Sequence, residues 1–237
     1  MKKLVSTTDG SHIFYRTIGQ GPPLFFIHGN SGSHNYFKQQ INFFKDRFQL
    51  ILMDTRDHGN SSNKKDHLSF EQIVSDMNVI MEHEKIKQTA LFGFSDGANI
   101  ALTFASYYQK KVSQMILVSP NITFNQLKPL QQFVSNKLHW MAKHIIRSKK
   151  KERVLQLARE DLPVTKDILS NLNVPTLVVM GDHDIVTPDK MSAFVKNLPL
   201  GHLSVIKRCG HSVPKLKPRE LNKLSLKFLE QKSLTTH

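Results

Sequence analysis

The feature that most constrains this fold is a regular alternation of short apolar runs with helical segments. The runs "LFFIH", "FQLILMD", "QTALFGF" and "SQMILVSP" are almost continuously apolar, as strands buried on both faces are. Helical patterns separate them; Ile73, Met77, Ile80 and Met81, for example, share one helix face. Strands that alternate with helices form a parallel sheet covered on both sides. The sequence therefore predicts a doubly wound, mostly parallel α/β fold.

The alternation pauses once. Residues 121–173 contain helical patterns but no convincing strand, and the alternation then resumes with "PTLVVMG" and "LSVIKR". Near the start, "KLVSTTDGSHIFYRT" indicates a hairpin that turns at Asp9-Gly10. We therefore expect a core made of residues 1–120 and 174–237, with a small helical cap, residues 121–173, inserted after the sixth strand.

The bulk composition narrows the class of protein. The 237 residues include 33 Lys and Arg against 19 Asp and Glu, which gives a net charge of +14. The charge is mostly dispersed, and no nucleic-acid-reading motif accompanies it. Cys209 is the single cysteine, so no intrachain disulfide can form. The chain has no apolar stretch near the ~18 residues of a membrane span and no signal-peptide core. We expect a cytoplasmic monomer or homodimer with no nucleic-acid partner and no stable membrane insertion.

A lone serine stands between two glycines where one predicted strand becomes a helix. The segment Gly93-Phe94-Ser95-Asp96-Gly97 fits the G-x-S-x-G nucleophile elbow. A sharp strand-to-helix turn strains the central residue, and flanking β-carbons would collide with the neighbouring strand and helix. The turn presents the Ser95 hydroxyl at the carboxyl edge of the sheet, where open α/β sheets bind ligands.

A serine hydroxyl becomes a nucleophile only when a base takes its proton, and an acid must orient that base. Both groups follow later strands. The segment "VVMGDHDIVTP" offers Asp182 and Asp184, and "VIKRCGHSVP" offers His211. The sequence therefore predicts a serine–histidine–aspartate triad, with two candidates for the acid.

Five motifs together carry a family resemblance. "FFIHGNSG", "DTRDHGNSS", "GFSDG", "GDHDIVTP" and "CGHSVP" resemble, in order and spacing, those of serine-dependent α/β-hydrolase-fold proteins of the small esterase, lactonase and carbon–carbon-bond hydrolase type. The resemblance spans roughly Leu4 to Leu229. The family pattern G-x-x-D-x-x-x-P falls on Gly181, Asp184 and Pro188, which implies that Asp184 is the acid. Some relatives place the acid after the preceding strand, but that strand ends here without a carboxylate, at "SPN".

The resemblance implies a mechanism without metal or cofactor. His211 deprotonates Ser95, which attacks an acyl carbon of a small carboxylic ester, lactone or thioester, and Asp184 stabilises the imidazolium. The oxyanion hole maps to the backbone N–H groups of Asp96 and Asn30, and a shift from Asn30 to Ser31 stays open.

Two other functions are compatible with the same fold and triad. A carbon–carbon-bond hydrolase keeps the same triad, and a hydrolase-fold receptor or regulatory partner binds a ligand with little turnover. Dehalogenases and epoxide hydrolases of this fold use an aspartate nucleophile, so Ser95 argues against both. There is no H-E-x-x-H or paired His/Cys spacing that would indicate a metal site.

Several side chains have more than one interpretation. The Asp96 carboxylate either attracts a substrate amine or caps its own helix. Asp57 occupies a position where the resembling loop usually has glycine. Residues 128–153 hold eight Lys and Arg against one acid, Glu152, and form either a surface that attracts anions or membrane, or a solvated outer face. Phe133 and Trp140 are cap candidates for substrate contact, and the other substrate contacts are unknown.

Overall fold

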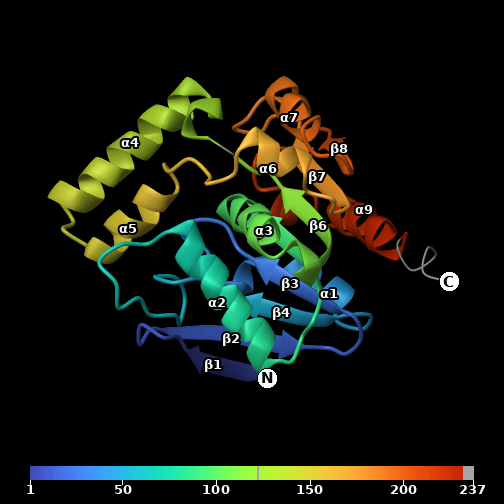
Figure 1. Ribbon diagram of the computed structural model, residues 1–237. Helices are drawn as coiled ribbons and strands as arrows, with labels where there is room; N and C mark the ends of the chain where they lie inside the picture. The colour runs from blue at the N-terminus through green and yellow to red at the C-terminus, as the bar shows by residue number, and fades with distance from the viewer. Residues whose placement is uncertain (122, 232–237) are drawn as a thin grey trace.

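An eight-stranded sheet forms the centre of the structure, a computed structural model that describes residues 1–121 and 123–231 (Figure 1). Residue 122, in the predicted cap, and residues 232–237, at the end of the predicted core, lie outside the described residues. The strand order is β1-β2-β4-β3-β5-β6-β7-β8. The strands are β1 (Lys2–Ser6), β2 (His12–Ile18), β3 (Pro23–Ile27), β4 (Gln49–Met53), β5 (Thr89–Phe94), β6 (Val112–Val118), β7 (Thr176–Gly181) and β8 (Gly201–Ile206).

The sheet is mostly parallel, as predicted. Strands β1 and β2 form an antiparallel hairpin, β2 pairs antiparallel with β4, and every other neighbouring pair is parallel. The carboxyl ends of the parallel strands therefore meet at one edge. The loops that follow β3, β5, β6, β7 and β8 all start from that edge.

Each central strand supplies both hydrophobic cores because successive side chains point to opposite faces. In β3, Leu24 and Phe26 enter one core and Phe25 and Ile27 the other, and all four are at most 1% exposed. Strand β4 repeats this alternation. This two-sided burial explains why these strands are continuously apolar in the sequence.

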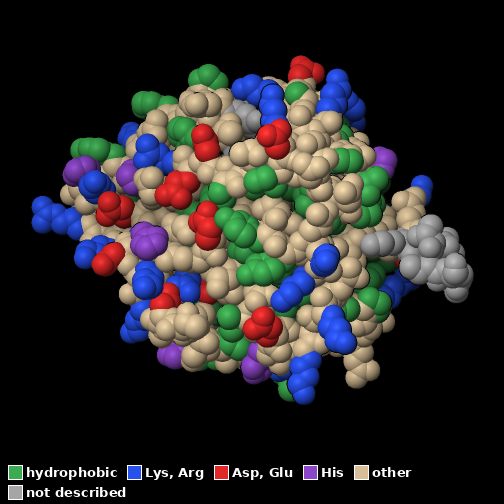
Figure 2. Space-filling view, viewed as in Figure 1, with side chains coloured by type: hydrophobic (Ala, Val, Ile, Leu, Met, Phe, Trp, Pro, Cys, Tyr) green, Lys and Arg blue, Asp and Glu red, His purple; other side chains and the backbone are tan. Residues whose placement is uncertain are grey.

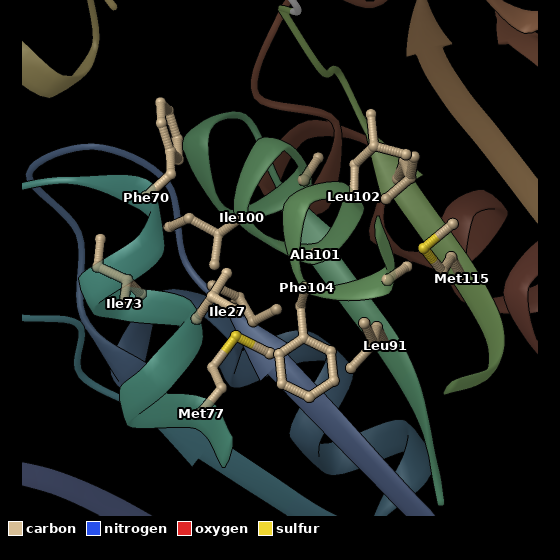
Figure 3. Close-up of a cluster of buried hydrophobic side chains, with 14 of the residues drawn as sticks. Ile27, Phe70, Ile73, Met77, Leu91, Ile100, Ala101, Leu102, Phe104 and Met115 are labelled. Carbon is tan, nitrogen blue, oxygen red and sulfur yellow. The ribbon is translucent and has the colours of Figure 1, made fainter. Parts of the chain in front are cut away.

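Helices cover both faces of the sheet. One core packs under α2, α3 and α7, with Met77, Ile100 and Phe104 at its centre (Figure 3). The other core packs under α1 and α9, with Phe44 and Leu221 buried there. The helices of the described residues are η1 (His34–Phe37), α1 (Lys38–Phe44), α2 (Phe70–His83), α3 (Asp96–Tyr107), η2 (Gln109–Lys111), η3 (Phe124–Gln126), α4 (Pro129–His144), α5 (Lys149–Leu157), α6 (Lys166–Ser170), α7 (Pro188–Val195), α8 (Val213–Leu216) and α9 (Pro218–Glu230).

The connection from β6 to β7 differs from the other crossovers. It contains η3, α4, α5 and α6, and residues 123–173 form no strand. Helices α4 and α5 pack against each other and stand away from the sheet (Figure 1). We call residues 129–157 the α4–α5 hairpin. The division of the chain into a core and an inserted cap at 121 and 173 stays a prediction.

Candidate active site

Ser95 lies at the junction of β5 and α3 in a backbone conformation that few non-glycine residues adopt. Its φ is 54° and its ψ is −121°, a region that costs about 1–3 kcal/mol. A β-carbon on Gly93 would lie 2.2 Å from the Gly97 carbonyl oxygen, and one on Gly97 would lie 2.0 Å from the Ile27 carbonyl oxygen. Both glycines are therefore required, because β3, β5 and α3 approach one another closely at this turn.

Ser95, His211 and Asp184 form a hydrogen-bonded row, although they follow three different strands. Nε2 of His211 lies 3.0 Å from Oγ of Ser95, and Nδ1 of His211 lies 2.7 Å from Oδ1 of Asp184. A carboxylate only accepts hydrogen bonds, so Nδ1 carries the proton and Nε2 accepts from the serine hydroxyl. The histidine ring also packs on Phe94, with ring centroids 5.2 Å apart. These distances suit proton transfer from Ser95 to His211.

The Asp184 carboxylate is buried but held in its charged form. Its side chain is 1% exposed, and burial alone raises the pKa of a carboxyl. Hydrogen bonds from His211, from the Ser119 hydroxyl and from the Ile185 N–H outweigh this burial and hold the pKa of Asp184 below its ordinary value. A charged acceptor therefore stands behind His211 at neutral pH.

The two acid candidates, Asp182 and Asp184, have different hydrogen-bond partners. One partner of Asp184 is Ser119, a residue that the sequence did not indicate. Asp182 accepts a hydrogen bond from the Cys209 N–H, in the loop after β8, and pairs with His183. Within the described residues it makes no hydrogen bond to the His211 ring. Ser119 follows β6 with a left-handed φ of 53°, and its hydroxyl donates to Oδ2 of Asp184. In the sequence, Ser119 was noted only as part of the strand end "SPN", which contains no carboxylate.

The loop after β3 runs beside Ser95 and offers a backbone donor. A β-carbon on Gly29 would lie 3.1 Å from Cβ of Ser95. Within residues 1–121 and 123–231, the N–H groups of Asn30 and Asp96 donate to no protein acceptor. The Ser31 N–H, in contrast, donates to Nε2 of His58 across 3.0 Å. The alternative donor at Ser31 is therefore already occupied, and the two donors without a partner belong to the two residues predicted.

Two buried histidines hold this loop in place. Nδ1 of His28 donates to the Gly29 carbonyl across 2.8 Å, and its Nε2 accepts from the Thr55 N–H across 3.2 Å. Burial and the neighbouring His58 lower the pKa of His28 to about 3, so the ring is neutral at physiological pH. Burial also lowers the pKa of His58, which leaves its Nε2 able to accept from Ser31. The sequence predicted that this loop supplies a backbone N–H donor, but it indicated no role for the side chains of His28 and His58.

The Asp96 carboxylate is buried next to the predicted oxyanion donors. Asp96 is 5% exposed, and its Oδ2 accepts from Nδ2 of Asn30 across 3.0 Å. Burial raises the pKa of Asp96, and the hydrogen bond from Asn30 only partly opposes this. In the described residues the carboxylate accepts no hydrogen bond from an N–H of α3, so it does not cap its own helix. Nδ2 of Asn30 also donates to the Val154 carbonyl of α5 across 2.7 Å.

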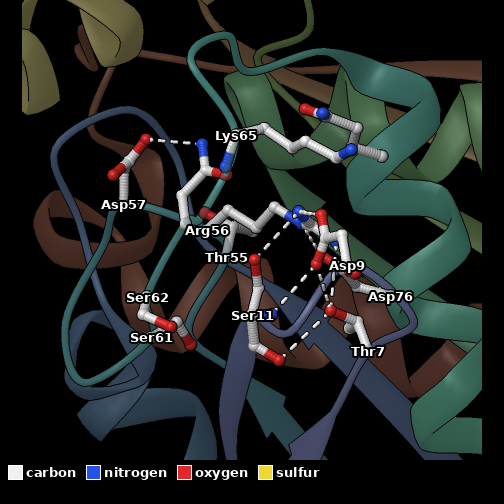
Figure 4. A network of polar contacts seen from close by, with 12 residues as sticks. Thr7, Asp9, Ser11, Thr55, Arg56, Asp57, Ser61, Ser62, Lys65 and Asp76 are labelled. Atoms are coloured by element: carbon white, nitrogen blue, oxygen red, sulfur yellow. Dashed lines mark hydrogen bonds and ion pairs between the residues drawn. The ribbon is translucent and has the colours of Figure 1, made fainter.

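Asp57 attaches the α4–α5 hairpin to the loop after β4. Its φ of 59° is left-handed, which explains why glycine suits this position in resembling loops. Nε and Nη2 of Arg153 donate to its two carboxylate oxygens, each across 2.7 Å. Next to Asp57 in the chain, Arg56 pairs with Asp76 and Asp9 and anchors the same loop to α2 and to the β1–β2 turn (Figure 4).

A cavity of about 460 Å³ lies between the α4–α5 hairpin and the loops after β3 and β4. Its hairpin wall is mostly apolar but also carries Lys150 and Lys151, and its other wall is polar. The lining residues include Leu138, Met141, Ile146, Val154 and Leu155 on the hairpin side, and Ser31, Asp57 and His58 on the opposite side. Ser95, His211 and Asp184 are not among the lining residues; Ser31, two residues after Gly29, connects the cavity wall to the loop that abuts Ser95.

Phe133 and Trp140 do not line this cavity. They are 65% and 54% exposed, and neither is among the lining residues of this cavity. Their prediction as substrate contacts therefore gains no support from the cavities. Leu138 and Met141, on the same helix, do face the cavity.

Across the described residues, no group of three or more His, Cys, Asp or Glu side chains is placed to hold a metal ion. In the same part of the chain, no helix combines the length and the apolar character that a bilayer-spanning helix needs.

Comparisons with known proteins identify a family and individual proteins that this chain resembles. A family model described as alpha/beta hydrolase fold matches residues 22–160, more than half of the chain. The chain is 27% identical over 121 residues to the AB hydrolase superfamily protein YisY of Bacillus subtilis, covering 50% of this chain and 45% of that protein. It is 29% identical over 107 residues to 3-oxoadipate enol-lactonase 2 of Acinetobacter baylyi, covering 44% of this chain and 40% of that protein. The chain thus spans less than half the length of these two curated relatives.

A solved structure covers nearly the whole fold. An esterase from Exiguobacterium antarcticum superimposes with a TM-score of 0.85 and 20% sequence identity, covering 97% of this chain and 100% of that chain. At this identity, the likeness is one of fold.

Proposed function

The chain belongs to the α/β-hydrolase-fold family, and from this premise we propose that it is a serine hydrolase with a Ser95–His211–Asp184 triad. Its substrate is a small carboxylic ester, lactone or thioester, which it cleaves through an acyl-enzyme on Ser95. The observation that carries the proposal is the hydrogen-bonded row from Oγ of Ser95 through His211 to Asp184. A strained serine turn beside an imidazole that a carboxylate orients has the geometry of an activated nucleophile.

The reaction begins when Nε2 of His211 takes the hydroxyl proton and Oγ of Ser95 attacks the acyl carbon. The carbonyl oxygen becomes an oxyanion, which the N–H groups of Asn30 and Asp96 receive. The charge on Asp184 stabilises the imidazolium formed on His211. His211 then protonates the departing alcohol or thiol, and the acyl group remains on Ser95.

Water completes the cycle by the same steps. His211 takes a proton from water, the hydroxide attacks the acyl carbon, and the second oxyanion collapses to release the acid and the Ser95 hydroxyl. Proton transfer and charge stabilisation both come from the chain's own groups, so the proposed reaction uses no cofactor or metal.

The cavity under the α4–α5 hairpin supports an apolar substrate group of limited size. Leu138, Met141 and Val154 form part of its apolar wall, and its volume is about 460 Å³. Small-molecule sites are typically apolar clefts of this order of volume with few polar groups. We place the acyl group of the substrate in this cavity, with the scissile carbonyl directed to Ser95.

A panel of p-nitrophenyl esters with increasing acyl length tests the proposal, together with one lactone and one thioester. We expect turnover that peaks at an intermediate acyl length and disappears in Ser95→Ala. Ser106→Ala is the matched control, because this serine lies at the opposite end of α3 and bonds only to the Thr103 carbonyl. Turnover that survives in Ser95→Ala would contradict the triad. Probe labelling of Ser95 without turnover of any ester, lactone or thioester would favour carbon–carbon-bond hydrolysis or a ligand receptor instead.

A further inference from the structure

Helix α4 presents its apolar face to solvent. Leu130, Phe133, Val134 and Trp140 lie on one side of the helix, beside Leu138 of the cavity wall. Their exposed fractions run from 46% to 66%. Single exposed apolar residues are ordinary on protein surfaces, but a continuous exposed helix face marks an interaction site.

The opposite face of α4 is polar, and this face packs inward. Gln132 donates to the Leu127 carbonyl across 2.9 Å, and His139 pairs with Arg159 across 2.9 Å. Ala142 is 1% exposed. A helix of a globular protein normally buries its apolar side, so the orientation of α4 leaves a surface that water solvates poorly.

Basic side chains surround this apolar face. Lys137 lies within it, between Phe133 and Trp140 in the chain, and is exposed. Arg147 and Lys149 are exposed in the turn after α4 and at the start of α5. The next two lysines, Lys150 and Lys151, are also exposed but line the cavity under the hairpin. Figure 2 shows hydrophobic and basic side chains together along the upper left margin, over α4 and α5 of Figure 1.

We propose that the outer face of the α4–α5 hairpin docks on an anionic lipid surface. A helix with Trp, Phe and Leu on one face and Lys or Arg around it lies in the bilayer interface, with its apolar side in the acyl boundary and its cations among the headgroups. Each basic residue near an anionic membrane strengthens binding roughly fivefold. Trp140 is amphipathic and suits the headgroup level. The docking is peripheral and requires no spanning segment.

Charge decides between a lipid surface and a second copy of the chain. In a symmetric dimer through α4, the exposed cations of one hairpin would face the same cations of its partner, with Glu152 as the sole acid of residues 128–153. Such like-charge contacts oppose association. An anionic lipid surface complements both the cations and the apolar side chains.

Trp140 provides a direct readout, because it is the only tryptophan of the chain. We expect a blue shift of its fluorescence, and co-sedimentation of the protein, with vesicles of phosphatidylglycerol and phosphatidylcholine. We expect neither with vesicles of phosphatidylcholine alone, and we expect added salt to weaken the binding. The same measurement on Ser95→Ala should give the same affinity, so the docking and the proposed catalysis are tested separately.

Paired variants locate the surface. Lys137→Glu with Lys149→Glu should weaken vesicle binding about tenfold or more, whereas Lys196→Glu with Lys223→Glu, exposed lysines of the core, should weaken it severalfold less. Phe133→Ala should also weaken binding, whereas Leu216→Ala, equally apolar and 60% exposed outside the hairpin, should not. Far-ultraviolet circular dichroism verifies that each variant is folded.

Three results would overturn the docking proposal. The first is an absence of both the shift and co-sedimentation with anionic vesicles. The second is equal loss of binding in the two double variants. The third is a concentration-dependent Trp140 shift and dimer without lipid, which would assign the face to a second copy of the chain.

Discussion

The hydroxyl of Ser119 donates to Oδ2 of Asp184 across 2.6 Å, while Oδ1 of the same carboxylate lies 2.7 Å from Nδ1 of His211. The carboxylate is therefore held from both sides, once by the strand end of β6 and once by the loop after β8. The Ser119 hydroxyl also lies 3.1 Å from the main-chain carbonyl oxygen of His211. Within the described residues it makes no hydrogen bond to the Ser95 hydroxyl or to the His211 ring, so we assign it as a positioning residue for the acid.

Ser119→Ala removes this support. A hydrogen bond to a charged group contributes about 1.5–3 kcal/mol, so we expect kcat to fall about tenfold to a hundredfold with KM unchanged. Ester kinetics measure both constants. Ser119→Gly is the control for backbone strain, because it relieves the left-handed φ and also lacks the hydroxyl. Recovery of kcat in the glycine variant would show that strain, and not the hydroxyl, caused the loss.

Gly97→Ala tests the close approach of α3 and β3. The added β-carbon would lie 2.0 Å from the Ile27 carbonyl oxygen, and the backbone must shift to accommodate it. Overpacking of this kind costs about 1–3 kcal/mol or more, so urea denaturation should show that loss of unfolding free energy. Gly210→Ala is the matched substitution, because its β-carbon would approach no atom closer than 3.8 Å. Equal stability of the two variants would contradict the packing at the elbow.

Arg153→Ala tests how the α4–α5 hairpin is attached. The pair with Asp57 is bidentate and mostly buried, with side chains 16% and 4% exposed. Among the described residues, its loss leaves the buried Asp57 carboxylate with the Asn63 amide as its one hydrogen-bond donor, so we expect more frequent local opening of the hairpin. A decrease of about 1 kcal/mol in the free energy of local opening corresponds to roughly fivefold faster cleavage. Limited trypsin digestion at the lysines of residues 143–151 measures it.

The control for this digestion is Arg47→Ala. Its pair with Glu230 is more than half exposed on both sides and lies outside the hairpin, and exposed pairs contribute little to stability. The same acceleration in both variants would mean that Arg153 does not attach the hairpin.

Asp96→Asn tests the buried carboxylate next to Ser95. Its pKa is raised by burial, so the folded state keeps the proton to higher pH than the unfolded state does. Its ionisation therefore lowers stability as pH rises through the folded-state pKa. Asp96→Asn removes this cost, so its gain in unfolding free energy should be larger near about pH 8 than near about pH 4. Denaturation at both values measures it, with Asp46→Asn reporting the loss of an exposed charge. A gain independent of pH would contradict the buried charge.

The same variant decides whether Asp96 selects substrates. The carboxylate already pairs with Asn30, so Asp96→Asn should affect amino-acyl and plain acyl esters equally. A selective loss on amino-acyl esters would support a role in attracting an amine.

The sequence predicts the strands well because two-sided burial makes each one a continuous apolar run, as in β3 and β4. Element boundaries are less accurate. A strand expected at 203–208 forms at Gly201–Ile206.

Some residues of the candidate site could be predicted from the sequence, and others could not. Ser95, His211 and Asp184 could be predicted because each belongs to a short motif at a strand end. Ser119 and Arg153 could not, because their contacts join residues 65 and 96 positions apart in the chain. Phe133 and Trp140 were expected as substrate contacts, but only the packing of the α4–α5 hairpin determines that they are exposed.

The most direct test of the central claim is the rate at which a fluorophosphonate modifies Ser95, measured by mass spectrometry of the intact chain and its peptides. We predict one adduct per chain, on Ser95. We predict no adduct in Ser95→Ala, and modification slowed by at least about 10³-fold in His211→Ala. Unmodified protein, or the same rate in His211→Ala, would contradict an imidazole-activated serine.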